Sequence, residues 1–101
     1  MEWKMQYNYI ITPKAVGEIT LFYSNVALKY RHVYSFEDME KNIYQAIYGA
    51  QLIEKSIPRR RPTIARWQDF FMAKAGKWYY AYSIERNDII IRDACHAQNM
   101  H

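Results

Sequence analysis

The chain has 101 residues, of which 50% are hydrophobic and 17% aromatic, and its formal net charge is +4. This composition excludes a disordered chain, the lack of any run of about 18 apolar residues excludes a membrane-spanning helix, and the single cysteine, Cys95, excludes an internal disulfide. The length, and an N-terminus without an apolar signal segment, predict one cytoplasmic domain that covers residues 1–101.

The first predicted elements are a strand and a helix. Residues 3–11 alternate large apolar side chains with polar ones, which is the period of a half-buried strand. Thr12 can then cap a helix that has Pro13 in its first turn, where a missing N–H group costs nothing. Apolar residues recur at helical spacing as far as Lys29, near which we expect the helix to end.

A second helix is predicted to begin after Ser35. Ser35 can cap this helix, and the acidic residues Glu37 and Asp38 fall in its first turn, where they complement the helix dipole. One apolar stripe continues from there to Ile57, and Pro58 stops the helix.

Three strand-like runs follow, at about residues 65–73, 77–84 and 89–96. The segments between them, residues 74–76 and 86–88, are short enough to force antiparallel hairpins. The order is therefore strand, helix, helix and three strands, which predicts an α+β fold with a helical hairpin on one face of a small twisted antiparallel sheet. We expect the other face of this sheet to be at least partly free to bind a partner.

The positive charge is concentrated in the C-terminal part of the chain. Residues 1–58 hold six basic and six acidic residues, whereas residues 59–101 hold eight basic and four acidic ones. A basic half with interspersed aromatic residues favours a nucleic acid or an acidic protein as partner, although an ordinary solvated face also explains it. The candidate target-binding residues are the proline-flanked cluster Arg59, Arg60 and Arg61, which can alternatively cap the second helix, together with Arg66, Lys74 and Gln98.

Five features occur together in this chain: the element order, the helix entry at residues 12–15, the proline and arginine segment after the second helix, the strand run at 76–82 and the ending at 95–99. With them the chain resembles the RelE/ParE superfamily of bacterial toxins along almost its whole length. The resemblance implies a small cytoplasmic toxin that a cognate antitoxin protein neutralises. RelE-like members of this superfamily cut messenger RNA on the ribosome, whereas ParE-like members inhibit DNA gyrase.

The resemblance also implies candidate catalytic residues. Attack of a ribose 2′-hydroxyl on the adjacent phosphate needs a base, an acid and cations, but neither a metal nor another cofactor. By resemblance to RelE-like toxins, His96 is the candidate general acid or base, and Arg92 and Lys77 are candidate phosphate stabilisers. Positions 92, 94 and 96 are spaced by two, so we expect Arg92 and His96 to share one face of the sheet. His101 is a second candidate, and Gln98 replaces a basic residue of the RNA-cutting pattern.

Three functions stay open at this point. The chain is a ribosome-dependent mRNA-cutting toxin, a ParE-like inhibitor of gyrase without enzymatic activity, or an inactive interaction module that keeps the fold. Trp3, Tyr44 and Tyr48 form an aromatic surplus that an antitoxin helix or an added strand would cover, and a homodimer is also left open. Cys95 lies in an apolar strand pattern, which favours a buried and inert thiol over a nucleophile.

Overall fold

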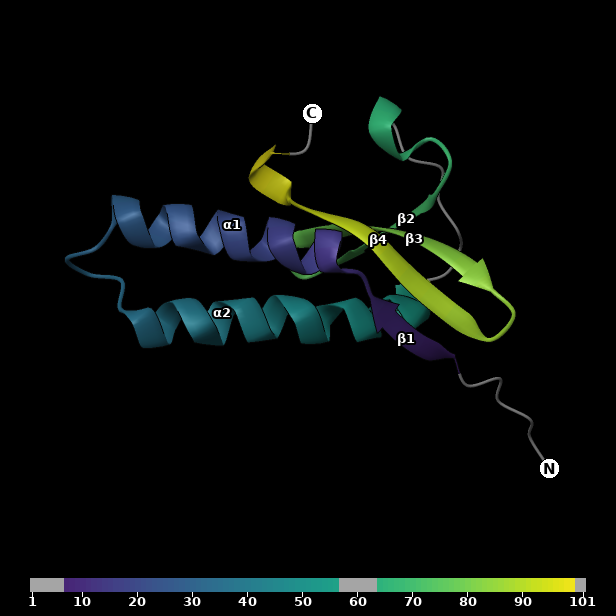
Figure 1. Cartoon of the computed structure of the whole chain (residues 1–101), viewed down its shortest axis with the longest axis horizontal. Helices are drawn as coiled ribbons and strands as arrows, with labels where there is room; N and C mark the ends of the chain where they lie inside the picture. Colours follow the sequence, from purple (N-terminus) through teal and green to yellow (C-terminus); the bar gives the residue numbers. More distant parts are fainter. Residues whose placement is uncertain (1–6, 57–63, 100–101) are drawn as a thin grey trace.

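The computed structural model describes residues 7–56 and 64–99 of the chain. Two helices lie side by side on one face of a four-stranded sheet (Figure 1), which confirms the predicted α+β layout. The elements in chain order are β1 (Asn8–Ile11), α1 (Pro13–Lys29), α2 (Phe36–Gly49), η1 (Ala50–Ser56), η2 (Ala65–Trp67), β2 (Phe71–Ala75), β3 (Trp78–Glu85), β4 (Asp88–His96) and η3 (Ala97–Asn99).

The sheet is mixed rather than antiparallel throughout. Its strand order is β1-β4-β3-β2, and β2–β3 and β3–β4 are the two predicted antiparallel hairpins. β1, however, pairs in parallel with β4, with Asn8 opposite Asp88 and Ile11 opposite Ile91. A helical pair separates β1 from the other strands, and an alternating sequence pattern is the same for either strand direction, so this orientation was not predictable. The predicted strand at 3–11 is confirmed for residues 8–11, and residues 3–6 lie outside the described part.

Both helices begin at the predicted residues. The Thr12 side chain accepts a hydrogen bond of 3.3 Å from the Ala15 N–H, and α1 ends at Lys29 as expected. Ser35 and Asp38 form a reciprocal capping box, in which each side chain accepts from the other residue's backbone N–H at 3.0 Å. The hydrogen bond that the Ser35 backbone N–H donates to the carboxylate is the main cause that lowers the pKa of Asp38.

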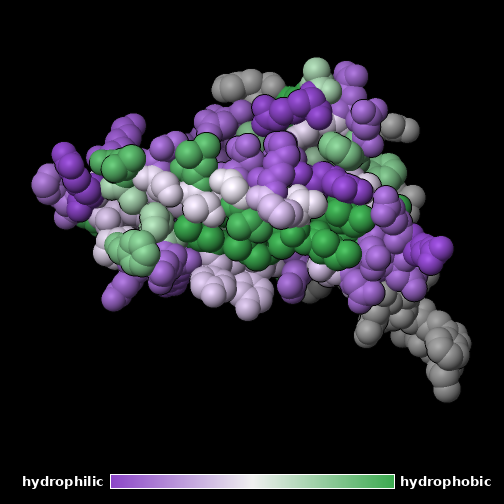
Figure 2. Space-filling model, in the orientation of Figure 1, coloured by the Kyte–Doolittle hydropathy of each residue, from purple (hydrophilic) through white to green (hydrophobic). Residues whose placement is uncertain are grey.

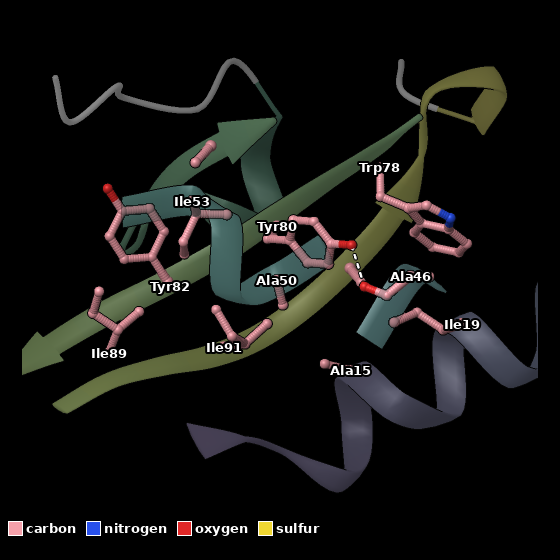
Figure 3. Close-up of a cluster of buried hydrophobic side chains, with 12 residues drawn as sticks. Ala15, Ile19, Ala46, Ala50, Ile53, Trp78, Tyr80, Tyr82, Ile89 and Ile91 are labelled. Atoms are coloured by element: carbon pink, nitrogen blue, oxygen red, sulfur yellow. Dashed lines mark hydrogen bonds between the residues drawn. The ribbon is translucent and has the colours of Figure 1, made fainter. Parts of the chain in front are cut away.

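The second helix changes its winding before the predicted end. α2 stops at Gly49, and η1 continues as a tighter 3-10 helix, in which the Ala50 N–H donates to the carbonyls of Ile47 and Tyr48 rather than to that of Ala46. The buried hydroxyl of Tyr80 donates to the Ala46 carbonyl instead (Figure 3). A long-range contact with β3 thus accompanies the change, whereas the predicted limits Ile57 and Pro58 lie outside the described residues.

The core lies between the helices and the sheet. Its fully buried side chains include Ile19 from α1, Ile53 from η1, Tyr80 and Tyr82 from β3, and Ile91 from β4 (Figure 3). On the outer side, hydrophobic residues form a band over the helical layer, bordered by hydrophilic ones (Figure 2). The helices therefore bury one apolar face and expose some of the other.

The first of the three predicted C-terminal strands begins later than expected. Residues 65–67 form the short helix η2, and β2 starts only at Phe71. Trp67 is completely buried against the sheet face opposite the helices, where it packs with Met72, Ala81 and Cys95. That second face was expected to be at least partly free, and η2 in fact covers part of it.

A β-bulge in β4 reverses the side-chain alternation of the strand. Tyr82 pairs with Ile91 and Ala81 pairs with Asp93, so Arg92 has no partner on β3. Ile91 faces the helices, and so does Ala94, three residues later. A regular strand would place these two positions on opposite faces, so the bulge decides which residues can meet at the end of β4.

The two hairpin turns differ in their backbone strain. The β2–β3 turn has Gly76 at φ 61°, whereas the β3–β4 turn has Arg86 at φ 57°, a left-handed conformation that costs a side-chain-bearing residue about 1–2 kcal/mol. A glycine there would avoid this cost but would lose about 0.5–1 kcal/mol of stability, because glycine gives up more conformational freedom on folding than other residues do. We expect Arg86→Gly to raise the free energy of unfolding by about 0.5 kcal/mol in urea titrations. Asn87→Gly is the matched control and should lower it, since Asn87 has no positive φ.

Candidate functional site

Arg92 and His96 lie on opposite faces of the sheet, contrary to the prediction that they share one. Arg92 donates from Nε to the Ser83 hydroxyl at 3.0 Å and from Nη2 to Glu85 at 3.4 Å, on the face away from the helices. The His96 ring stacks on Phe22 of α1, with centroids 4.2 Å apart and planes inclined by 8°. The bulge at Arg92 is the reason, because it shifts the parity of every residue after it.

His96 is held in its neutral form. The side chain is only 8% exposed, and its Nδ1 accepts a hydrogen bond of 3.2 Å from the Gln98 N–H. Burial, followed by the nearby charge of Lys77, lowers the pKa of His96. A neutral imidazole that accepts at Nδ1 carries its proton on Nε2, so His96 presents an N–H donor rather than a basic nitrogen.

Lys77 lies at the tip of the β2–β3 turn rather than in the strand where it was predicted. β2 ends at Ala75 and β3 begins at Trp78, so Gly76 and Lys77 are the two turn residues. The side chain is exposed, and no ion pair joins it to any residue of the described ranges 7–56 and 64–99. Lys77 therefore offers an unneutralised ammonium group close to His96.

Lys77 and His96 line a common pocket on the helix side of the sheet, here called the Lys77 pocket. Its volume is about 420 Å³, and it lies between α2, the β2–β3 turn and the end of β4. Its polar lining residues include Tyr23, Asn42, Gln45, Lys77, Tyr80 and His96. The expected cationic site on the uncovered face of the sheet is therefore not formed: Arg92 lies on that face, whereas Lys77 and His96 lie on the helix side.

Arg92 belongs to a second group of charges, arranged around Asp93. This carboxylate is 6% exposed and accepts from the Trp67 indole N–H at 2.8 Å and from the Ala94 N–H at 2.9 Å. Lys14 lies 3.1 Å and Arg66 3.9 Å from its Oδ2 atom. With Thr12 and Phe70, these charged residues and Arg92 line a pocket of about 480 Å³.

The other predicted binding residues are dispersed. Arg59, Arg60, Arg61 and the alternative catalytic candidate His101 lie outside the described residues. The Lys74 ammonium lies 5.6 Å from the centre of the Tyr79 ring, and the exposed Gln98 approaches His96 through its backbone N–H. Of the described members of the predicted set, Lys77 and His96 share the Lys77 pocket, whereas Arg66 and Arg92 lie together around Asp93.

Sequence reasoning missed several residues that define these pockets. Asn42 and Gln45 stand three positions apart on α2 and both reach the Lys77 pocket. Their spacing places them on one helix face, which is a usable signal, but two exposed amides on a helix are ordinary. Asp93 was not singled out in the sequence, because only the fold brings Trp67 and Lys14 to it.

An apolar strip runs along the exposed side of α2 and η1 and comprises Tyr44, Tyr48 and Leu52. These side chains are 62%, 60% and 54% exposed, and the two tyrosine rings stack with centroids 6.1 Å apart. The strip lines a shallow, mainly apolar depression. The expected exposure of Tyr44 and Tyr48 is confirmed, while Trp3, the third residue of that prediction, lies outside the described part.

The neutral state of His96 predicts a pH-dependent stability. Because the folded protein binds this proton less readily than the unfolded chain does, the stability from neutral His96 is complete above about pH 6.5 and is lost as the pH falls toward the lowered folded-state pKa. We expect wild type to lose more stability than His96→Phe between about pH 7 and about pH 5 in urea unfolding. Phenylalanine can keep the stack on Phe22 but cannot titrate. Parallel curves for the two proteins would contradict a buried neutral imidazole.

Within residues 7–56 and 64–99, no helix is both long and apolar enough to cross a bilayer. The Cys95 side chain is buried, and this burial raises the pKa of its thiol. No three His, Cys, Asp or Glu side chains of the described residues are grouped as metal ligands would be.

No protein-family model matches the chain, and comparison with curated proteins gives no match either.

Proposed function

We propose that this chain is a growth-inhibiting toxin of the RelE/ParE type that cuts messenger RNA on the ribosome, with the Lys77 pocket as its reacting centre. The single observation that carries the proposal is the pairing of the exposed Lys77 ammonium, free of any ion pair with the described residues, with the neutral His96 imidazole in one pocket of about 420 Å³. Basic surplus in residues 59–101 supports RNA as the partner.

The proposed reaction uses the substrate, these side chains and solvent water. The ribose 2′-oxygen forms a bond to the adjacent phosphorus and gives its proton to water, while the bond from phosphorus to the 5′-oxygen breaks and that oxygen takes a proton from water. Lys77 stabilises the charge that grows on the phosphorane, and His96 donates a hydrogen bond through Nε2–H.

The geometry changes the role first expected for His96. A neutral imidazole with Nδ1 already accepting from Gln98 is a hydrogen-bond donor to substrate and not a general base. Catalysis then depends on holding the 2′-oxygen in line with the phosphorus, which is a contribution that a ribosome-bound message supplies. Arg92 leaves the reacting set, and together with Arg66 it is proposed to contact the RNA backbone from the other face of the sheet.

Lys77→Ala tests this proposal. In a purified assay with ribosomes and message, we expect cleavage to fall about 100-fold or more, because the phosphorane loses its cation. Lys29→Ala is the matched control, since Lys29 is also an exposed lysine but lies at the far end of α1. Growth on induced expression should recover in the Lys77→Ala strain and not in the Lys29→Ala strain. Wild-type cleavage by Lys77→Ala would refute the reacting centre.

A second candidate function is a non-enzymatic toxin of the ParE type that binds DNA gyrase. The observation in its favour is the exposed Tyr44, Tyr48 and Leu52 strip, because a large apolar patch on a small protein marks a protein contact. A supercoiling assay tests it: inhibition by the purified chain without RNA cleavage would select this candidate. No effect in either assay, and no effect of induction on growth, would leave the third reading, an inactive interaction module.

A cognate antitoxin is part of both toxin proposals. An amphipathic helix of the antitoxin packing on the Tyr44 strip would bury its apolar side chains. For the RNA-cutting toxin, the test is co-expression with the adjacent small reading frame: growth should recover, and Tyr48→Glu should prevent that recovery while the toxin still cuts message. Size-exclusion chromatography of the isolated chain separately reports whether a homodimer covers the strip.

A further inference from the structure

We infer that the Lys77 pocket accepts one unpaired nucleotide, with its base against α2 and its phosphate at Lys77, and that Gln45 and Asn42 select the base. This inference rests on the proposed function in one respect, namely that RNA is the substrate. The inference goes beyond the proposed function because it assigns a base preference to side chains of this protein.

The hydrogen-bonding groups of the pocket suit the edge of a nucleobase. The Asn42 amide nitrogen donates to the Tyr34 hydroxyl at 2.6 Å, so one N–H of this amide and its Oδ1 atom remain for other hydrogen bonds. Gln45 is exposed and makes no side-chain hydrogen bond with the described residues, which leaves both a donor and an acceptor for a ligand. Amide side chains that donate and accept side by side are the groups that read the edges of unpaired bases.

A third group is fixed by the aromatic cluster behind the pocket. The Trp78 indole N–H donates to the Tyr23 hydroxyl at 3.1 Å, and Trp78 packs edge-on against both Phe22 and His96. Because the Tyr23 oxygen already accepts one hydrogen bond, its own proton is available to donate into the pocket. Tyr23 and His96 are therefore held by packing before any ligand arrives, as selective sites require.

The size and charge of the pocket fit a single nucleotide better than a folded polyanion. Part of its lining is formed by small residues, namely Ala46, Gly49, Ala75 and Gly76, which leave about 420 Å³ open, within the range of small-ligand sites. Lys77 is the only cation among the lining residues that the structure describes, which suits one phosphate group. His96 adds no charge, because it is neutral.

The experiment is a titration of the full chain with AMP, GMP, CMP and UMP, followed by ¹⁵N–¹H spectra of backbone and side-chain amides. We expect the side-chain amide signals of Gln45 and Asn42 to shift with saturation, and one nucleotide to bind about 10-fold more tightly than the weakest. Gln45→Ala should abolish this preference, and Gln51→Ala is the matched control, because Gln51 is also exposed but lies outside the Lys77 pocket. Lys77→Ala should weaken all four nucleotides equally.

Three outcomes would overturn the inference. Equal binding of all four nucleotides and of ribose 5-phosphate would mean that the pocket holds a phosphate without reading a base. No binding of any nucleotide at millimolar concentration, while ribosome-dependent cleavage persists, would separate this failure from the proposed function. Cleavage whose codon preference is unchanged in Gln45→Ala would likewise count against base selection by this residue.

Discussion

Trp67→Ala is expected to lower the free energy of unfolding by about 3–5 kcal/mol, the largest effect of any single substitution considered for this chain. Trp67 is completely buried and fills the space between η2 and the sheet face opposite the helices, next to Met72, Ala81 and Cys95. Truncation would open a cavity there and would also remove the indole N–H that donates to Asp93 at 2.8 Å. Urea unfolding followed by circular dichroism measures the loss.

Two further substitutions separate packing from hydrogen bonding. Trp67→Phe keeps an aromatic ring but leaves the Asp93 carboxylate with one donor fewer. We expect the lost hydrogen bond to lower the free energy of unfolding by about 1.5–3 kcal/mol. Asp93→Asn keeps an oxygen for the indole but removes the attraction for Lys14 and Arg66, both largely exposed, and should cost less. A Trp67→Ala protein as stable as wild type would mean that η2 does not pack on this face.

Tyr80→Phe is expected to lower the free energy of unfolding by about 1–3 kcal/mol although it removes only one oxygen atom. The Tyr80 hydroxyl donates to the Ala46 carbonyl, which the Ala50 N–H does not reach because η1 is wound more tightly than α2. In the variant this buried carbonyl loses that donor. Burial also raises the pKa of the Tyr80 phenol, so this group should ionise in alkali only as the protein unfolds.

Tyr44→Phe provides the matched control for that measurement. Tyr44 stacks on the Tyr48 ring and is 62% exposed, so water can replace any contact of its hydroxyl. We expect a change within about 0.5 kcal/mol. Equal effects of the two substitutions would contradict the assigned role of the Tyr80 hydroxyl. Gly49→Ala adds a second check, because a β-carbon there would come within 3.1 Å of the same oxygen.

The helices of this fold were predictable because their signals are local. Thr12 with Pro13 and Ser35 with Asp38 are capping pairs within four residues of each other, and both operate as predicted. The residue at which the second helix stops being α-helical was less predictable. α2 ends at Gly49, where the hydroxyl of Tyr80, more than thirty residues away in the chain, donates to the Ala46 carbonyl.

The candidate site was only partly predictable, and the reason is again that residues far apart in the sequence come together in it. Lys77 and His96 were candidates by resemblance alone, and the fold places both at one pocket, although Lys77 lies in a turn rather than in the expected strand. The prediction that Arg92 shares a face with His96 was wrong, because no residue near Arg92 indicates a β-bulge in the sequence. Asn42, Gln45 and Tyr23 were missed because the pocket forms only when α1 and α2 pack on the sheet.

The unpaired position at Arg92 has a consequence for comparisons between this chain and any relative. A relative that lacks this one residue can keep every remaining rung of the β3–β4 ladder, because Ile91 and Asp93 already pair with adjacent residues of β3. A correct alignment with such a chain would need its gap in the middle of a strand. An ungapped alignment would instead match His96 with the preceding or following residue of the relative and so transfer the functional label to a side chain on the wrong side of the sheet.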